Sequence, residues 1–344
     1  MHAIKKYEVM MTEQIVLASR PKGTPDNENL RFENTSLAEM QDDEVELEAA
    51  YFSVDPYMRG RMNDVKSYIA PFKLNEPLEG GAIAKVITSN AKDFKAGDMV
   101  TGFLPWRLRT ISPVKGLRKI TPSGVPITYH LDVLGMTGLT AYFGLIDIGK
   151  PTTGETVVVS GAAGAVGVVA GQIAKIRGCR VIGIAGTDEK IQRLKDEFGF
   201  DEAINYKTTP DMKKAIAALC PKSVDIYFDN VGGEISDAVI SNINFHARIP
   251  LCGQISLYNS KEIPIGPRLQ PMLLTRSVLM QGFIIFNYQH RFAEGIDQLT
   301  KWVQEGKLKF TETIVKGFDQ MPAAFLGLFK GENIGKMIVE VKRK

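Results

Sequence analysis

Residues 157–167, VVVSGAAGAVG, decide the fold of this chain. Four residues suited to a buried strand run directly into three glycines separated by small or apolar residues. A strand, a glycine-rich turn and a helix form the phosphate-binding corner of a doubly wound parallel sheet. In such a corner Gly164 lets the backbone approach a pyrophosphate, and Gly167 lets the helix pack close to the strand. The helix N-terminus offers unpaired N–H groups to the anion.

The stretch therefore predicts a dinucleotide site made by Ala163, Gly164, Ala165, Val166 and Gly167. Relative to the usual G-x-G-x-x-G pattern the first position is Ala162, and Gly161 lies one residue earlier. The pattern alone is a weak signal, and the alternative is a glycine corner that serves only packing. The strand, helix and second strand that surround it at the right distances favour the dinucleotide site.

Strands and helices alternate from residue 135 onward. Helices are predicted at 137–148, 166–177, 188–198, 211–219, 235–243 and 292–305. Strands are predicted at 156–160, 180–185, 202–205, 224–229, 247–252 and 278–286. This alternation is typical of a parallel sheet covered by helices on both faces.

The residues before this region predict a different architecture. Residues 14–130 favour β-structure, because short apolar runs such as 44–52, 81–88 and 99–103 are broken by turn residues. The end of the chain predicts a helix at 322–329 and a strand at 336–341 that returns to the β-rich part. The fold class is therefore α/β, with a β-rich domain at 1–134, a nucleotide-binding domain at 135–308 and a C-terminal return at 309–344. The loop at 261–276 carries no diagnostic pattern.

The composition excludes several classes of protein. The 344 residues are 44% hydrophobic and 24% charged, as in an ordinary soluble globular protein. A net charge of +3 with scattered Lys and Arg provides no basic block for a nucleic acid. Three widely spaced cysteines argue against disulfides or structural zinc and favour a reducing, cytoplasmic location: Cys179, Cys220 and Cys252.

No membrane attachment or signal peptide is expected. Residues 1–14 lack an apolar signal-peptide core. Met10 and Met11 stand just ahead of a strand-like start, so the residues before them suit a disordered extension or an upstream start codon. The uncharged stretch at 157–174 barely reaches spanning length and begins with a β-branched run followed by glycines.

The end of the second strand after residue 150 decides between NAD(H) and NADP(H). An NAD site commonly places an acidic residue there to bind the ribose 2′-hydroxyl. Here the strand ends in Ala185-Gly186-Thr187, without an acid. Lys190 can reach back to a 2′-phosphate, with Thr187 as a hydroxyl donor. We therefore predict NADP(H), although Lys190 could instead be a solvated helix lysine.

Several motifs resemble one family. They are GAAGAVG (161–167), TDEK (187–190), NYK (205–207), FDNVGG (228–233), CGQIS (252–256) and DPYMRGRM (55–62). Over about residues 14–342 the chain resembles the zinc-independent medium-chain reductases. The most similar members are the leukotriene B4 dehydrogenase/prostaglandin reductases, the plant alkenal double-bond reductases and the bacterial curcumin reductases. The resemblance implies a GroES-like catalytic domain, a Rossmann domain, NADPH, and reduction of an α,β-unsaturated carbonyl at its C=C bond.

The resemblance also implies roles for individual residues. It places Lys190 and Tyr206 at the 2′-phosphate, and Tyr258 near the substrate end of the cofactor. It implies further cofactor contacts, several of them near the nicotinamide, for Thr137, Asn230, Cys252, Gly253, Phe283 and Asn333. It also suggests that the strand at 278–286 extends a sheet across a homodimer, with a purely internal strand as the alternative.

The chemistry needs groups that stabilise negative charge without a metal. The histidines have no metal-ligand spacing: they are His2, His130, His246 and His290. Hydride delivered to the β-carbon of an enone pushes charge onto the carbonyl oxygen, and the enolate needs hydrogen-bond donors. Tyrosine hydroxyls and the ribose hydroxyl of the cofactor are the available kinds of donor, and Tyr57 and Tyr258 are the candidate residues. The alternative for each is a tyrosine that fills a domain interface.

We therefore expect an NADPH-dependent 2-alkenal or enone reductase that acts on a small unsaturated carbonyl. A quinone oxidoreductase on the same scaffold is the nearest alternative. A cofactor-binding sensor or crystallin-like protein without turnover is the alternative of another class. The α-carbon proton comes from a tyrosine or from water, and the sequence does not decide between them.

Overall fold

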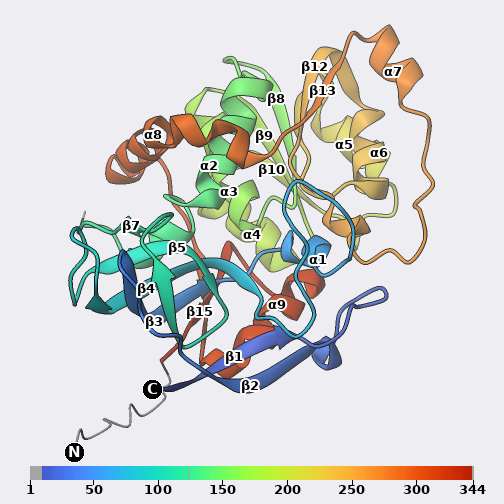
Figure 1. The fold of residues 1–344 in the computed structure, drawn as a ribbon. Coiled ribbons are helices and arrows are strands. Elements are labelled where there is room, and N and C mark those ends of the chain that lie inside the picture. The colour runs from blue at the N-terminus through green and yellow to red at the C-terminus, as the bar shows by residue number, and fades with distance from the viewer. Residues whose placement is uncertain (1–9, 123, 343–344) are drawn as a thin grey trace, which may run out of the picture.

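The computed structural model describes residues 10–122 and 124–342, which form two domains that meet along one boundary (Figure 1). One domain is rich in antiparallel β-structure, and the other is built on a parallel sheet. This architecture confirms the predicted α/β class, a GroES-like β-rich domain joined to a doubly wound Rossmann domain. The extension expected at residues 1–9 and the last two residues of the basic tail lie outside the described residues.

The β-rich domain holds a seven-stranded sheet with the order β14-β15-β3-β4-β5-β7, in which β6 also pairs with β3. A separate hairpin pairs β1 with β2. The strands are β1 Met11–Leu17, β2 Leu30–Ser36, β3 Glu44–Ser53, β4 Glu79–Ser89, β5 Met99–Pro105, β6 Arg109–Pro113, β7 Arg118–Lys119, β14 Glu312–Lys316 and β15 Lys336–Glu340, and the helices are α1 Met58–Arg61 and α9 Met321–Lys330. Because β15 pairs antiparallel with β3, the last strand of the chain lies in the N-terminal sheet.

The Rossmann domain holds six parallel strands in the order β10-β9-β8-β11-β12-β13. The strands are β8 Thr156–Ser160, β9 Arg180–Ala185, β10 Glu202–Asn205, β11 Val224–Phe228, β12 Ile243–Leu251 and β13 Leu279–Gly282. The helices are α2 Met136–Phe143, α3 Ala165–Ile176, α4 Asp188–Asp196, α5 Met212–Leu219, α6 Gly233–Ile240, α7 Gln270–Thr275 and α8 Phe292–Gln304.

Helices cover both faces of this sheet because successive side chains of a strand point to opposite sides. Val157 and Val159 of β8 belong to a buried cluster that includes residues of α2, α3 and α8. Val158 belongs to a second cluster, which includes residues of α5 and α6. The strand order reverses between β8 and β11, and ligands of such sheets bind at the carboxyl ends of the strands at this point. Among the described helices, none has the length and apolar character needed to cross a bilayer.

The predicted helix at 137–148 is present, but its second half is of a different type. The α-helix ends at Phe143, and Gly144–Gly149 continue as a π-helix. Gly144 lies directly against the ring of Phe283, and a Cβ atom at this position would lie 2.5 Å from that ring. The glycine thus permits an aromatic side chain to pack against the wider turn.

The predicted strand at 278–286 is wrong beyond Gly282. Its partner β12 ends at Leu251, because the next two N–H groups, of Cys252 and Gly253, both donate to the carbonyl of Asp229. The chain after Gly282 therefore has no neighbouring strand to pair with. It continues into a 3₁₀ segment, Ile285–Arg291.

Two smaller differences lie nearby. The helix predicted at 235–243 spans Gly233–Ile240, and Ile243 begins β12 instead because it pairs with Val224 of β11. The segment at 261–276, which has no diagnostic pattern, contains α7.

Candidate functional site

The glycine corner brings α3 unusually close to the end of β8. Gly161 has a φ of +58°, and the N–H of Gly164 donates to its carbonyl at 3.0 Å. A Cβ atom on Gly167 would lie 2.3 Å from the same carbonyl oxygen, so no larger residue fits without movement of the backbone. Gly164 is the N-cap of α3 and has no capping side chain. The first N–H groups of this helix therefore lie at a partly exposed glycine turn without a side-chain cap, as an anion site requires.

A segment near the C-terminus lies against this corner. The N–H of Gly335 donates to the carbonyl of Ala163 at 2.8 Å. Asn333 donates from its side-chain amide to the carbonyl of Gly335 at 2.7 Å. The structure thus brings Asn333, predicted to contact the cofactor, next to the glycine turn although the two are far apart in sequence.

A basic site lies at the ends of β9 and β10. The Nζ atom of half-buried Lys190 donates to the carbonyl of Gly331 at 2.6 Å. Burial first, and then the positive charge of Lys207, lower the pKa of Lys190. The ring of Tyr206, which is 41% exposed, packs over Gly186, where a Cβ atom would lie 3.0 Å from it. Two neighbouring cations beside an exposed aromatic ring form a site suited to an anionic group.

Two threonines act first as local structural groups. Thr187 is the N-cap of α4, and its hydroxyl accepts a 3.3 Å hydrogen bond from the N–H of Lys190. The hydroxyl of Thr137 donates to the backbone carbonyl of Asp132 at 2.9 Å and lies 3.1 Å from its carboxylate. Asp132 is fully enclosed, and this burial raises its pKa to about 7.

The buried Asp229 organises the end of β11, and the sequence reasoning did not single it out. Its backbone carbonyl accepts from Cys252 and Gly253 at 2.9 and 3.1 Å, and its carboxylate accepts from the hydroxyl of Ser160 at 3.1 Å. Asn230 donates from its amide to the carbonyl of Ser160 at 2.8 Å. These bonds gather three predicted cofactor contacts beside the end of β8. The available sequence signal was an Asp-Asn pair at a predicted strand end.

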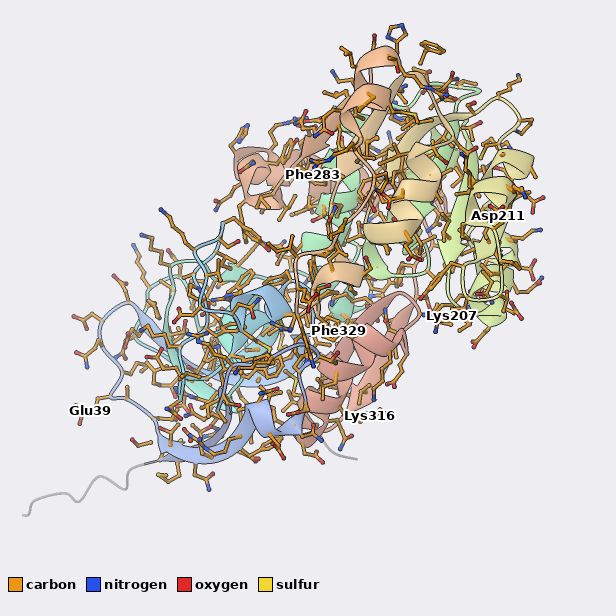
Figure 2. The ribbon with its side chains drawn as sticks, turned by 90° about the vertical axis from the view of Figure 1, so that its right-hand side faces the viewer. Glu39, Lys207, Asp211, Phe283, Lys316 and Phe329 are labelled. Atoms are coloured by element: carbon orange, nitrogen blue, oxygen red, sulfur yellow. The ribbon has the colours of Figure 1, made fainter. Side chains whose placement is uncertain are left out.

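The ring of Phe283 is part of the core of the Rossmann domain. The side chain is 8% exposed and meets Phe228 edge-on, with ring centroids 6.4 Å apart. Figure 2 labels Phe283 within this domain. Contact between Phe283 and a cofactor therefore stays a prediction, and its ring already has a packing role.

Three tyrosines converge where the domains meet. The buried hydroxyl of Tyr57, at the start of α1, has no hydrogen-bond partner among the described residues. The hydroxyl of Tyr258 accepts a 3.3 Å bond from the N–H of Gln254 and lies above Gly253. Burial raises the pKa of both phenols above the ordinary value. Figure 1 shows α1 at the boundary facing the Rossmann domain.

The third tyrosine, Tyr68, was not predicted. Burial first, and then the nearby phenol of Tyr258, raise the pKa of Tyr68 to about 12. The phenol of Tyr68 is in turn one of the groups that raise the pKa of Tyr57. Tyr68 therefore lies near both predicted donors, although its side chain is 53% exposed. It stands in an irregular loop without a periodic pattern, so nothing local in the sequence marks it.

Metal ligands do not gather in the described part of the chain. No group of three or more His, Cys, Asp or Glu side chains among residues 10–122 and 124–342 is placed to hold a metal ion.

Two family models match the chain. The model described as the N-terminal domain of oxidoreductase matches residues 13–120, and the model described as zinc-binding dehydrogenase matches residues 165–301. The NADPH-dependent curcumin reductase of Escherichia coli is 43% identical, over 95% of this chain and 96% of its own. The NADP(+)-dependent 2-alkenal reductase of Nicotiana tabacum is 38% identical, over 98% of this chain and 99% of its own.

A solved structure also matches the fold closely. CurA from Vibrio vulnificus, crystallised in complex with NADPH, superposes with a TM-score of 0.92 at 44% identity, over 96% of this chain and 100% of that chain. Together with the two relatives, this match establishes that the chain belongs to the zinc-independent medium-chain dehydrogenase/reductase family of oxidoreductases.

Proposed function

We propose that this enzyme reduces the C=C bond of α,β-unsaturated aldehydes and ketones with NADPH. One observation carries the proposal: Tyr57 and Tyr258 lie in segments joined by the Arg59–Asn259 hydrogen bond, and their O–H groups donate to no acceptor in the described residues. A buried donor without an acceptor is costly, unless a ligand supplies that acceptor. A carbonyl oxygen is an acceptor of this kind.

The residues of the corner and of the basic site fit NADPH. Gly164 and Gly167 leave backbone N–H groups open at the start of α3, where a pyrophosphate would be held. Lys190 and Tyr206, near Lys207, would hold the 2′-phosphate that distinguishes NADPH from NADH. The relatives whose names include NADP or NADPH support the same cofactor for this chain.

Further contacts to the cofactor are proposed for residues that the structure gathers near the corner. Asn230, Cys252 and Gly253 lie at the end of the sheet, where the strand order reverses. Asn333 reaches the glycine turn through Gly335. Thr137 and Phe283 complete this set, together with Ala163, Ala165, Val166 and Thr187.

Bound NADPH would supply the hydride for the β-carbon of the substrate, and a proton from a tyrosine or from water would complete the product at the α-carbon. The chain's own contribution is to hold the carbonyl oxygen, on which negative charge develops. Tyr57 and Tyr258 would donate to this oxygen, since both phenols are protonated at neutral pH and burial raises the pKa of each further. Tyr68 stands close to Tyr258 as a third protonated phenol, with a pKa of about 12. Because the Tyr57 hydroxyl is buried, a hydrogen bond made there would be stronger than the same bond in water.

The test is NADPH oxidation with a panel of enals, enones and quinones, with identification of each product. The proposal expects a saturated aldehyde or ketone from an enal or enone. Formation of quinol alone would favour a quinone oxidoreductase. NADPH binding without turnover of any substrate would favour a sensor or crystallin-like protein.

The assembly and location form part of this proposal. The edge strand β13 has a free side on the sheet, and its Leu279 is 46% exposed, which suits a homodimer with a continuous sheet. Light scattering that shows only a monomer would reject the dimer. The proposed location is the cytoplasm, so the protein should be recovered in the cytoplasmic fraction of the cell.

A further inference from the structure

A lysine side chain lies in the core of the β-rich domain, with all of its hydrogen bonds satisfied. Lys336, the first residue of β15, is 2% exposed. Its Nζ atom donates to the carbonyls of Val54 and Met337 at 2.9 and 3.1 Å and to the carboxylate of Asp55 at 3.0 Å. Three donors thus meet three acceptors, two of which belong to the segment that leads to Tyr57.

The carboxylate of Asp55 is held from a second side. The hydroxyl of Ser53 donates to its other oxygen. The backbone carbonyl of Asp55 in turn accepts the N–H of Met58 at 3.1 Å, which closes the turn that contains Tyr57. The position of Tyr57 therefore follows from the position of Asp55, and Asp55 is fixed by Lys336 and Ser53.

The residue before Lys336 is fixed to the cofactor corner. Gly335 donates to the carbonyl of Ala163 at 2.8 Å and has a φ of +66°. A Cβ atom at Gly335 would lie 1.8 Å from the carbonyl oxygen of Thr311, so this position has no room for a larger residue. Two consecutive residues thus touch the glycine corner of one domain and the tyrosine segment of the other.

We propose that Lys336 is a positioning residue that sets the place of Tyr57 relative to the glycine corner. A buried ion pair is a weak device for stability, because desolvation offsets its attraction. The ion pair is instead specific in geometry, because the three hydrogen bonds of the ammonium have fixed directions. They hold the segment at 54–57 in one place. Apolar packing alone would leave that segment free to slide. The inference rests on the proposed function, in which Tyr57 donates to the substrate carbonyl.

The experiment introduces the paired substitution Asp55→Asn/Lys336→Met into two backgrounds, the wild type and Tyr57→Phe. Each product is compared with its own background. The paired substitution removes both charges, so neither is left buried without a partner. Lys316→Met is the matched control: Lys316 lies on the neighbouring strand β14, is 50% exposed and is labelled at the outer side of the domain in Figure 2. Ser53→Ala is the milder variant, which removes one hydrogen bond to Asp55 and keeps the ion pair.

Lys336 acting through Tyr57 gives a specific pattern of kinetics. The paired variant loses about tenfold to a hundredfold in kcat on a small enone, with the NADPH Kd from fluorescence titration within about twofold. In the Tyr57→Phe background the same substitutions change kcat by less than about twofold, because the group they position is already absent. Ser53→Ala shows a smaller loss that also disappears in that background. Lys316→Met behaves as the wild type.

Hydrogen exchange of the protein without cofactor provides a readout that does not depend on activity. Peptides that cover residues 53–62 exchange faster in the paired variant, and peptides from β9 and β10 do not. Equal fold-losses with and without Tyr57, or unchanged exchange at 53–62, would overturn the proposal. If the wild type reduces no enone, the proposed function fails, and the exchange experiment still decides whether Lys336 holds the segment.

Discussion

Arg59 donates from Nε to the side-chain oxygen of Asn259 at 3.1 Å, across the boundary between the two domains. Arg59 stands two residues after Tyr57, and Asn259 directly follows Tyr258. A second nitrogen of the same guanidinium donates to the carbonyl of Gly23 at 2.8 Å. The bond therefore ties the segment of one tyrosine to the segment of the other. Two donors held in a fixed relation can bind one oxygen without reorganisation during the reaction.

Replacing Tyr258 by phenylalanine tests this arrangement. The substitution removes the hydroxyl that lies above Gly253 and retains the aromatic ring. We expect kcat on a small enone to fall by ~10²–10³-fold, because one hydrogen bond to the developing charge is lost. The NADPH Kd changes little. Stopped-flow single turnovers and a fluorescence titration measure the two quantities.

Tyr142→Phe is the control for the loss of a phenol elsewhere in the chain. Its hydroxyl lies 3.4 Å from Glu294, within the Rossmann domain. This variant should retain the wild-type kcat. An unchanged kcat in Tyr258→Phe would remove Tyr258 from the mechanism.

Lys190→Ala should reduce the preference for NADPH over NADH. The ammonium of Lys190 lies near that of Lys207, and burial is the main cause that lowers its pKa. Because the two cations together form the proposed anion site, removal of one of them weakens the site. We expect the NADPH Kd to rise about tenfold to a hundredfold, with the NADH Kd nearly unchanged. The measurement is kcat/KM with each cofactor, together with the two dissociation constants.

A lysine on the same helix provides the comparison for this cofactor experiment. Lys195 of α4 is 41% exposed and forms a surface ion pair with Glu202, so Lys195→Ala should leave the preference intact. Equal use of both cofactors by the wild type would contradict the assignment to NADP(H).

The parallel-sheet domain could be predicted because its signals are local. The run from β8 through Gly167 contains a strand, a turn and a helix within a dozen residues, each with its own pattern. The limits of β13 could not be predicted from its own residues. An apolar run is compatible with a longer strand, and only the end of the neighbouring β12 stops the pairing.

The tyrosine site could be predicted only in part for a related reason. Tyr57 and Tyr258 lie in or beside recognisable motifs. Tyr68 lies in a loop, and only the folding of the chain brings it near Tyr258. Lys336 and Asp55 are 281 residues apart in sequence, and a lysine at the start of an apolar strand reads as a surface residue. Contacts of this kind depend on the tertiary pairing of segments that are far apart in the chain, such as β15 with β3, which no local pattern encodes.

Gly167→Ala should destabilise the fold as well as the cofactor site. The added methyl group would lie 2.3 Å from the carbonyl oxygen of Gly161, so α3 must move away from β8. We expect a loss of about 1–3 kcal/mol in the free energy of unfolding, together with weaker NADPH binding. Gly282→Ala is the matched control, because no heavy atom lies within 4 Å of its added methyl group. Equal unfolding midpoints in urea for the two variants would contradict the packing role of Gly167.

The stability of the protein should fall with rising pH because of Asp132. Burial raises the pKa of Asp132 to about 7 in the folded protein, against 3.8 for an ordinary aspartate. Between these values the folded state binds a proton that the unfolded state releases. The contribution is therefore complete below the lower pKa and is lost as the pH rises through about 7. Asp132→Asn keeps an acceptor for Thr137 and abolishes this titration.

Urea unfolding followed by circular dichroism at several pH values measures the effect. From about pH 5 to about pH 8 the wild type should lose about 2–3 kcal/mol more in the free energy of unfolding than Asp132→Asn. Glu39→Gln, at an exposed carboxyl labelled in Figure 2, is the control and should follow the wild type. If the wild type and Asp132→Asn lose stability in parallel, Asp132 is already ionised in the folded state. The hydrogen bond from Thr137 would then be made to a carboxylate, and the rise in pKa attributed to burial would be wrong.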